Sequence, residues 1–128
     1  MCLIPENLKY TATHEWVEEL EDGRVKIGLT DYAQKELSDI VYVNLPEVED
    51  EFEAGSEMAD VESVKAVSTI YCPVSGKVAE INEELYDAPE KVNEAPYEAW
   101  LVILEDVSMT DGLLDNYEYA KVIEEEKD

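Results

Sequence analysis

One lysine stands apart from the other charged residues. Lys65 is the only basic residue between Lys35 and Lys77, and both of its neighbours are small and apolar. It falls between two β-rich runs separated only by residues 63–66, a spacing typical of a hairpin with the ammonium group at its tip. A lysine held there is accessible to a modifying enzyme, and a cofactor joined by an amide would remove its charge and add a long lever. A plain solvated surface lysine is the alternative interpretation.

Other side chains with reactive chemistry are few and scattered. His14 is the only imidazole and stands close to Trp16 in the sequence, which favours a structural role. The two thiols, Cys2 and Cys72, are too few for a disulfide framework and indicate reduced cysteines. The sequence shows no nucleophile elbow, no phosphate-binding loop, no dinucleotide fingerprint and no calcium-loop spacing. It therefore predicts neither a catalytic site nor a metal site.

The composition fits one acidic domain. The chain has 128 residues, 45% of them hydrophobic, with 33 Asp and Glu against 9 Lys and Arg, which gives a formal net charge of −24. Such a charge excludes general nucleic-acid binding, because neutralising phosphates needs basic residues, and it disfavours anionic membrane surfaces. No apolar run approaches the ~20 residues of a membrane span, and the N-terminus lacks the basic and apolar regions of a signal peptide. We therefore expect a cytoplasmic protein.

The elements that must position Lys65 are mostly short strands. Alternating and β-branched runs between turn residues predict six or seven of them. Thr30 is expected to cap a short helix over residues 30–37, residues 82–96 are expected to be irregular, and a C-terminal helix is expected over residues 110–123. The expected strands lie in residues 10–17, 24–29, 40–45, 58–62, 67–72, 77–81 and 100–104.

A faint internal repeat indicates two similar halves. Residues 38–43 resemble residues 75–81, and each segment is followed by an acidic loop and then a strand. Repeated β units of this kind favour a quasi-two-fold arrangement. Together with the strand count, the repeat predicts a mostly β small barrel or sandwich.

The residues around Lys65 resemble a known modification site. The sequence VESVKA at residues 61–66 is similar to the lipoylation site of the glycine cleavage H-protein family. The resemblance is colinear over about residues 9–123. Its further matches are YTATHEW at residues 10–16, GLTDYAQ at 28–34, DIV at 39–41, LPEV at 45–48, PVSG at 73–76 and VNE at 92–94.

That resemblance implies a particular fold. The family has a lipoyl-domain-like barrel-sandwich hybrid of two small antiparallel sheets, with a short internal helix and a C-terminal helix. Residues 1–128 are then expected to form a single H-protein domain, with a lipoyl-binding core at residues 24–106 and the C-terminal helix at residues 110–123.

It also implies a cofactor and partners. Lipoate is expected on Lys65 through a covalent amide, with Glu62, Ser63, Val64 and Ala66 as the recognition context. The arm would carry an aminomethyl group from a pyridoxal-phosphate glycine decarboxylase to a tetrahydrofolate-dependent aminomethyltransferase, and a dihydrolipoyl dehydrogenase would reoxidise the dithiol. Lipoate-attaching enzymes would be further partners. The protein itself would be a non-catalytic, monomeric carrier.

The resemblance further implies a cleft that shelters the loaded arm. Thr13 and Glu15 match the family's cleft residues, and the carboxylate suits a cationic amine. Many members carry an acidic residue four positions after the lysine, where this chain has Thr69. Residues 96–100, PYEAW, are one residue shorter than the family's glycine-containing segment, which is expected near the cleft. Neither departure touches lipoylation itself.

Two other functions stay open at this point. An H-protein-like lipoyl carrier that donates lipoate to other proteins, or serves sulfur oxidation, is favoured slightly by Thr69 and the altered segment 96–100. An unmodified binding or scaffold module is the third interpretation. A biotin carrier is disfavoured, because such domains place methionines where this chain has Val64 and Ala66.

Overall fold

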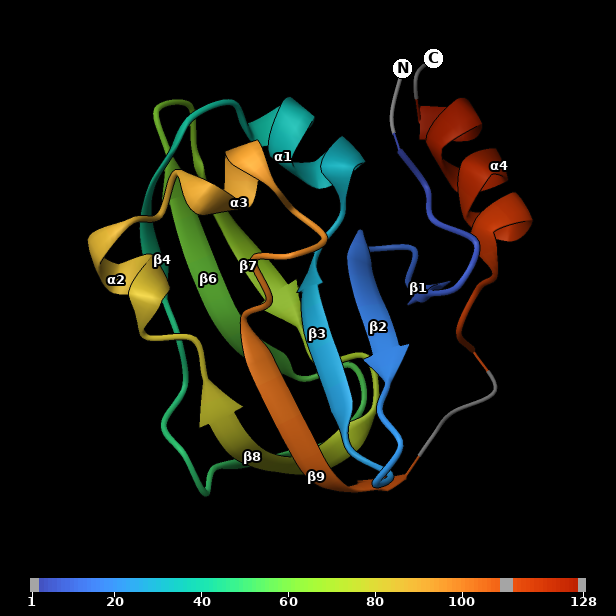
Figure 1. The fold of residues 1–128 in the computed structure, drawn as a ribbon. Helices are drawn as coiled ribbons and strands as arrows, with labels where there is room; N and C mark the ends of the chain where they lie inside the picture. The colour runs from blue at the N-terminus through green and yellow to red at the C-terminus, as the bar shows by residue number, and fades with distance from the viewer. Residues whose placement is uncertain (1–2, 109–111, 127–128) are drawn as a thin grey trace.

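Two antiparallel sheets of unequal size make up the body of the molecule (Figure 1). The computed structural model describes residues 3–108 and 112–126. The larger sheet has the order β1-β2-β3-β9-β8-β5, and the smaller one the order β4-β6-β7. The strands are β1 Lys9–Tyr10, β2 Glu15–Glu19, β3 Val25–Leu29, β4 Ile40–Asn44, β5 Glu51–Phe52, β6 Glu57–Ser63, β7 Val67–Tyr71, β8 Ser75–Ile81 and β9 Val102–Ser108. The prediction of a mostly β fold with two antiparallel sheets is confirmed.

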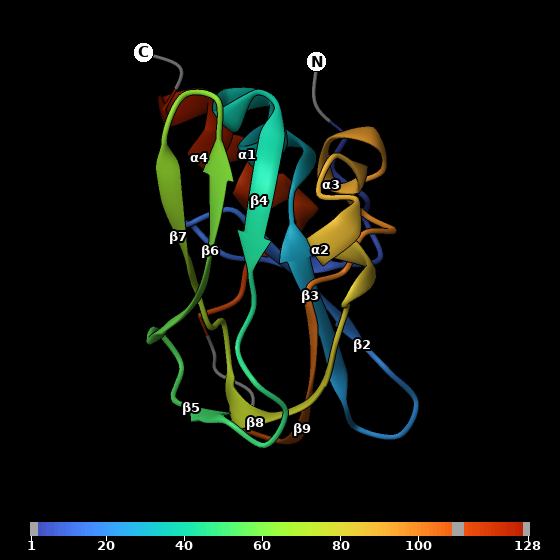
Figure 2. The same ribbon diagram turned by 90° about the vertical axis from the view of Figure 1, so that its left-hand side faces the viewer.

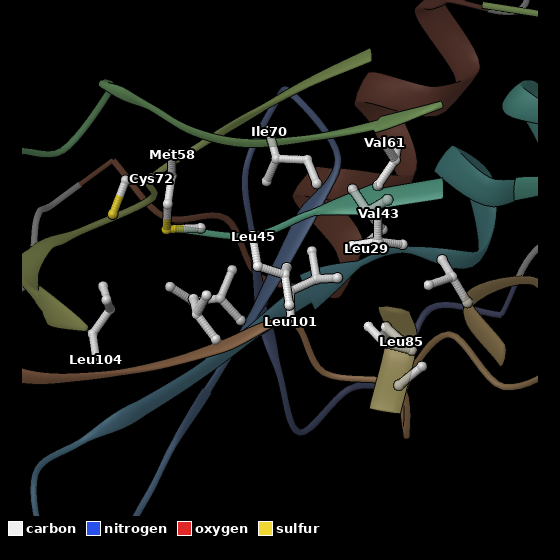
Figure 3. Packing of buried hydrophobic residues seen from close by; sticks show 14 of the residues in the cluster. Leu29, Val43, Leu45, Met58, Val61, Ile70, Cys72, Leu85, Leu101 and Leu104 are labelled. Carbon is white, nitrogen blue, oxygen red and sulfur yellow. The ribbon is translucent and has the colours of Figure 1, made fainter. Parts of the chain in front are cut away.

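The core lies between the two sheets. Val43, Val61 and Ile70 of the smaller sheet are fully buried, and Val43 and Val61 lie beside Leu29 of the larger sheet (Figure 3). Alternate residues of each strand point inward, as a sheet with one buried face requires. The two segments of the faint repeat, β4 and β8, lie in opposite sheets, and each pairs antiparallel with a later strand, β6 and β9 respectively.

The N-terminal segment differs from its prediction. Residues 10–17 are not one strand, because a turn separates β1 from β2. His14 in that turn has a positive φ of 74°, which no strand residue adopts. The hairpin of β2 and β3 is as predicted, with Gly23 at φ 86° in its turn.

Helix α1, Asp31–Leu37, matches its prediction. The Thr30 hydroxyl accepts a hydrogen bond from the Ala33 backbone N–H at 3.2 Å, so the predicted N-cap is confirmed. The helix joins β3 of the larger sheet to β4 of the smaller one, and it lies at the end of the barrel where β6 and β7 turn (Figure 1).

Two one-turn helices occupy the segment expected to be irregular. Helix α2 is Glu84–Asp87 and helix α3 is Lys91–Glu94. Leu85 and Val92 are both buried and anchor the two turns in the core. Because these apolar residues are isolated among polar ones, the sequence shows no helical periodicity there.

The C-terminal helix begins later than expected. Helix α4 is Asn116–Glu126, and the Leu114 backbone instead pairs with Tyr10 in a two-way β-bridge. Asp115 and Glu118 form a reciprocal cap, each carboxylate accepting the other's backbone N–H, which fixes this start. Residues 109–111, where the helix was expected to open, lie outside the described part. Within that part, no helix is long and apolar enough to cross a membrane.

Candidate functional site

Lys65 sits at the tip of the hairpin between β6 and β7. The strands pair up to Glu62 and Val67, which leaves a tight turn. The Ser63 hydroxyl accepts hydrogen bonds from the backbone N–H groups of Lys65 and Ala66, each at 3.1 Å, and the Ser63 N–H donates to the Ala66 carbonyl at 2.8 Å. One short side chain therefore fixes the backbone that presents the lysine.

The hairpin tip is tied to helix α1 and its C-terminal turn. The Lys65 ammonium donates to the Glu36 backbone carbonyl at 3.0 Å, and the Val64 N–H donates to the Asp39 carbonyl at 3.0 Å. The carbonyl of Glu36 is one of the last in the helix and has no partner further along it, so a cation is favourable there. Val64 remains 65% exposed. The lysine is thus aimed from a rigid tip toward α1.

A cleft of about 180 Å³ opens next to this contact, between α1, β7 and the turn that carries His14. Thr13 and Thr69, which the sequence assigned to an arm cleft, both line it. The other lining residues are His14, Leu29, Tyr32, Ala33, Glu36, Leu37, Ser68 and Glu126. Glu36 contributes both to the cleft and to the lysine contact, so the cleft begins where the Lys65 side chain ends.

Glu15 lies one layer deeper than the other predicted cleft residues. Its side chain is buried, and it lines a neighbouring hollow of about 300 Å³ rather than the cleft. The carboxylate accepts hydrogen bonds from the Thr11 hydroxyl at 2.5 Å and from the Thr13 hydroxyl at 2.6 Å. Its other oxygen accepts the Tyr71 N–H at 3.3 Å. Burial raises the pKa of Glu15, and these hydrogen bonds offset part of that effect. Thr13 lines both hollows and joins them.

Residues 96–100 do not line the cleft, although the sequence placed them near it. They pack on the far side of β2, where the Trp16 indole N–H donates to the Pro96 carbonyl at 3.0 Å. The Tyr97 hydroxyl accepts the Asp31 N–H at 3.1 Å, at the opposite end of α1 from the lysine contact. The shortened segment therefore supports the barrel rather than the cleft.

His14 and Glu126 are cleft residues that sequence reasoning missed. The imidazole Nδ1 is hydrogen-bonded to the Tyr119 hydroxyl at 2.7 Å, and Nε2 lies 3.0 Å from a Glu126 oxygen. The sequence favoured a structural role for His14 and did not indicate that the residue would lie at the cleft wall. No local pattern marks Glu126, because its contact with His14 spans 112 positions of the chain.

A larger hollow lies elsewhere. It has a volume of about 540 Å³ and is lined mainly by residues of β5, β8 and β9. The labelled parts of β5 and β8 lie at the end of the barrel opposite the turn between β6 and β7 (Figure 2). Lys77 there is paired with Glu49 and Glu105 at 3.6 and 3.7 Å. Among the described residues, no group of three or more His, Cys, Asp or Glu is placed to hold a metal ion. The cleft at Lys65 is smaller, but it is the one that adjoins an exposed, positioned nucleophile.

The molecule is a two-sheet barrel that presents one lysine on a fixed hairpin tip beside a cleft. This arrangement is typical of a carrier-type domain. The family model described as "Glycine cleavage H-protein" matches residues 8–126. A glycine cleavage system H protein from Lachnoclostridium phytofermentans is 52% identical over 123 residues, covering 96% of this chain and 97% of the relative. One from Halalkalibacterium halodurans is 54% identical over 129 residues, covering 98% and 100%.

Structural similarity leads to the same family. The crystal structure of a glycine cleavage system H protein from Mycobacterium marinum superposes with a TM-score of 0.86 at 38% identity, covering 92% of this chain and 97% of that one. The chain belongs to the glycine cleavage H-protein family.

Proposed function

We propose that this protein is a lipoylated carrier of the glycine cleavage system. Its lipoyl-lysine arm at Lys65 shuttles an aminomethyl group from the glycine decarboxylase to the aminomethyltransferase. The observation that carries the proposal is the exposed Lys65 on a hydrogen-bonded hairpin tip, whose ammonium contacts Glu36, a residue that lines a cleft. Family membership supports the same function.

The residues around Lys65 fit an acyl group on its amine. Glu62, Val64 and Ala66 are exposed, so an attaching enzyme can reach both faces of the tip. Acylation removes the lysine charge but leaves one N–H on the amide nitrogen. That N–H can keep the hydrogen bond to the Glu36 carbonyl, now 3.0 Å from the amine, and so hold the root of the arm at the cleft. Bound lipoate supplies a disulfide that takes an aminomethyl group on one sulfur and a proton on the other.

The cleft residues are proposed to shelter the end of the arm. An arm of this type reaches on the order of 14 Å, long enough to enter the cleft and to leave it for a partner's active site. Thr13 and Thr69 offer hydroxyl groups along the wall. Glu15 is proposed to act through Thr13, because its carboxylate already accepts three hydrogen bonds and does not line the cleft.

The chain is proposed to act as a carrier and not as an enzyme. Decarboxylation, transfer of the one-carbon unit and reoxidation of the dithiol would belong to the pyridoxal-phosphate glycine decarboxylase, the aminomethyltransferase and the dihydrolipoyl dehydrogenase. Lipoate-attaching enzymes would load Lys65. The protein is proposed to work as one monomeric domain over residues 1–128, with residues 24–106 as the lipoyl-binding core; a cytoplasmic location stays the prediction made from the sequence.

A second candidate keeps the arm and changes the pathway. The cleft wall has Thr69 where many of the H proteins that this chain resembles have an acidic residue, so one charge that would hold a cationic amine is missing. A lipoyl carrier that donates lipoate, or serves another lipoate-dependent system such as sulfur oxidation, needs no such charge.

Loading the arm tests both candidates. Lipoylated protein is mixed with a glycine decarboxylase and glycine, and CO₂ release and the mass of the Lys65 peptide are followed. Glycine-dependent CO₂ release with an aminomethyl mass on that peptide is expected, and Lys65→Arg, which keeps the charge but cannot be acylated, should show neither. A lipoyl mass without loading would favour the second candidate. No lipoyl mass after exposure to an attaching enzyme would refute both.

A further inference from the structure

The C-terminal end of α4 forms part of the cleft wall. Both views of the ribbon place three elements at the same end of the molecule: the hairpin tip, α1 and the end of α4 (Figures 1 and 2). Glu126 on α4 lines the cleft together with Glu36, Thr13 and Thr69. A residue near the end of the chain therefore contributes to the site that Lys65 adjoins.

The carboxylates of this cleft have different positions relative to the arm. Among the described lining residues, only Glu36 and Glu126 are acidic. The Glu36 backbone carbonyl already accepts a hydrogen bond from the Lys65 ammonium, so this residue stands at the root of the arm. Glu126 stands instead at the part of the wall formed by His14. An extended arm carries its far end away from its root and toward this second carboxylate.

Glu126 is held by a partner that it can exchange. Its two oxygens lie 3.0 and 3.1 Å from the same His14 Nε2. The other imidazole nitrogen is fixed by the Tyr119 hydroxyl, which is also 2.7 Å from the Thr30 hydroxyl. The histidine is thus anchored on its inner side, whereas the Glu126 side chain is 44% exposed and has no contact but His14 to hold it among the hydrogen bonds and ion pairs of the described residues.

We propose that Glu126 binds the cationic amine at the end of the Lys65 arm and gives up His14 to do so. The inference rests on the proposed function, because it requires a cationic group on the arm. Glu126 supplies the negative charge that Thr69 does not, from another part of the cleft lining. Helix α4 then contributes a binding residue to the cleft, and the His14–Glu126 contact is the arrangement adopted when no cationic arm is bound.

A tethered amine tests this contact without lipoate. In a Cys2→Ser background, Lys65→Cys is coupled to an alkyl methanethiosulfonate about 14 Å long that ends in an ammonium group. The thiolate forms a disulfide with the alkyl-sulfur group, and methanesulfinate leaves. A matched reagent that ends in a hydroxyl group is the control. Cys72 is buried and does not compete.

The readout is the imidazole of His14, which is the only histidine in the chain and gives an unambiguous NMR signal. The ammonium tether should move the His14 ¹⁵N and ¹H signals, and the hydroxyl tether should not. Glu126→Gln should abolish the difference between the two tethers, whereas Glu125→Gln, the same charge change on the same helix, should preserve it. Equal His14 signals with both tethers, or a difference that survives Glu126→Gln, would overturn the proposal.

A second measurement uses lipoylated protein. The arm is first reduced and then condensed with formaldehyde and ammonia. In this condensation one thiol, CH₂O and NH₃ give S–CH₂–NH₂ and one water. Glu126→Gln should shorten the lifetime of this group by about two- to fivefold, the range of a partly exposed ion pair. Glu126→Asp should restore part of it. If Glu36→Gln shortens the lifetime and Glu126→Gln does not, the inference is wrong. Because loading here needs no glycine decarboxylase, failure of glycine-dependent loading would be a separate result.

Discussion

Gly28 is a position at which replacement by alanine should strongly destabilise the fold. It pairs with Trp16 across β2 and β3, and a Cβ built on Gly28 would lie 2.6 Å from two carbons of the indole ring. An ordinary contact needs about 3.4 Å, so the ring must retreat by about 0.8 Å. Trp16 is buried, and its N–H donates to the Pro96 carbonyl at 3.0 Å. Gly28→Ala therefore displaces a buried aromatic side chain and strains its hydrogen bond.

The expected cost can be worked out from these contacts. Overpacking a core costs about 1–3 kcal/mol, and weakening a buried hydrogen bond costs about 1 kcal/mol more. Alanine recovers roughly 0.5–1 kcal/mol, because glycine is unfavourable inside a strand. Gly28→Ala should therefore lower the free energy of unfolding by about 2 kcal/mol. For a domain of this size that corresponds to a fall in Tm of about 8 °C.

A double-mutant cycle separates the clash from other effects. Urea unfolding followed by circular dichroism is measured for Gly28→Ala, Trp16→Phe and the double variant. The phenyl ring lacks the indole atoms closest to the new methyl group, so adding Gly28→Ala to Trp16→Phe should cost at least 1 kcal/mol less than adding it to the parent protein. An equal cost in both backgrounds would refute the argument that the indole ring sets the requirement for glycine.

The remaining predictions concern the site. Lys65→Arg should abolish the lipoyl mass increment while changing the free energy of unfolding by less than about 0.5 kcal/mol; a larger loss would mean that Lys65 is structural. Ser63→Ala removes the acceptor of two backbone N–H groups and should destabilise the protein by about 1 kcal/mol and slow lipoylation, both measured against Ser108→Ala, at an exposed serine outside the cleft, as control. Burial raises the pKa of Glu15, so the folded protein binds more protons than the unfolded chain between the two pKa values. The Glu15 contribution is therefore present below the unfolded pKa and is lost as pH rises through the folded one. In urea unfolding from pH 4 to 8, the free energy of unfolding of Glu15→Gln should not show this pH-dependent loss. A difference in that free energy between the parent protein and Glu15→Gln that does not change with pH would contradict the argument.

The features that the sequence predicted well are those set by neighbouring residues. Thr30 caps α1 because its hydroxyl reaches an N–H three residues on, and Gly23 turns the first hairpin because it adopts a positive φ. The tip at Lys65 was predictable for the same reason, since the two flanking strands and the short gap between them are local patterns. The number of such strands predicted a mostly β barrel or sandwich, and the resemblance to the H-protein family implied the arrangement in two antiparallel sheets.

The features that were missed depend on contacts between distant segments. Nothing near Glu126 shows that it will meet His14, and nothing near Glu15 shows that it will be buried beside Tyr71 rather than in the cleft. The start of α4 was also set from a distance, because the backbone of Leu114 pairs with Tyr10 in a β-bridge instead of joining the helix. Packing between segments overrode the local helical pattern there.

The molecule has a second, smaller core beneath α4. Tyr119 and Ile123 of the helix pack there on Tyr10 and Trp16, and the rings of Tyr10 and Tyr119 stack with centroids 4.8 Å apart. Apart from the bridge between Tyr10 and Leu114, the backbone hydrogen bonds of the two sheets in the described part of the chain run between strands and leave α4 out. Local unfolding of α4 therefore breaks few bonds of the barrel. Its amides should exchange with solvent hydrogen at a lower free energy than those of β6, so that one wall of the cleft opens while the hairpin stays folded.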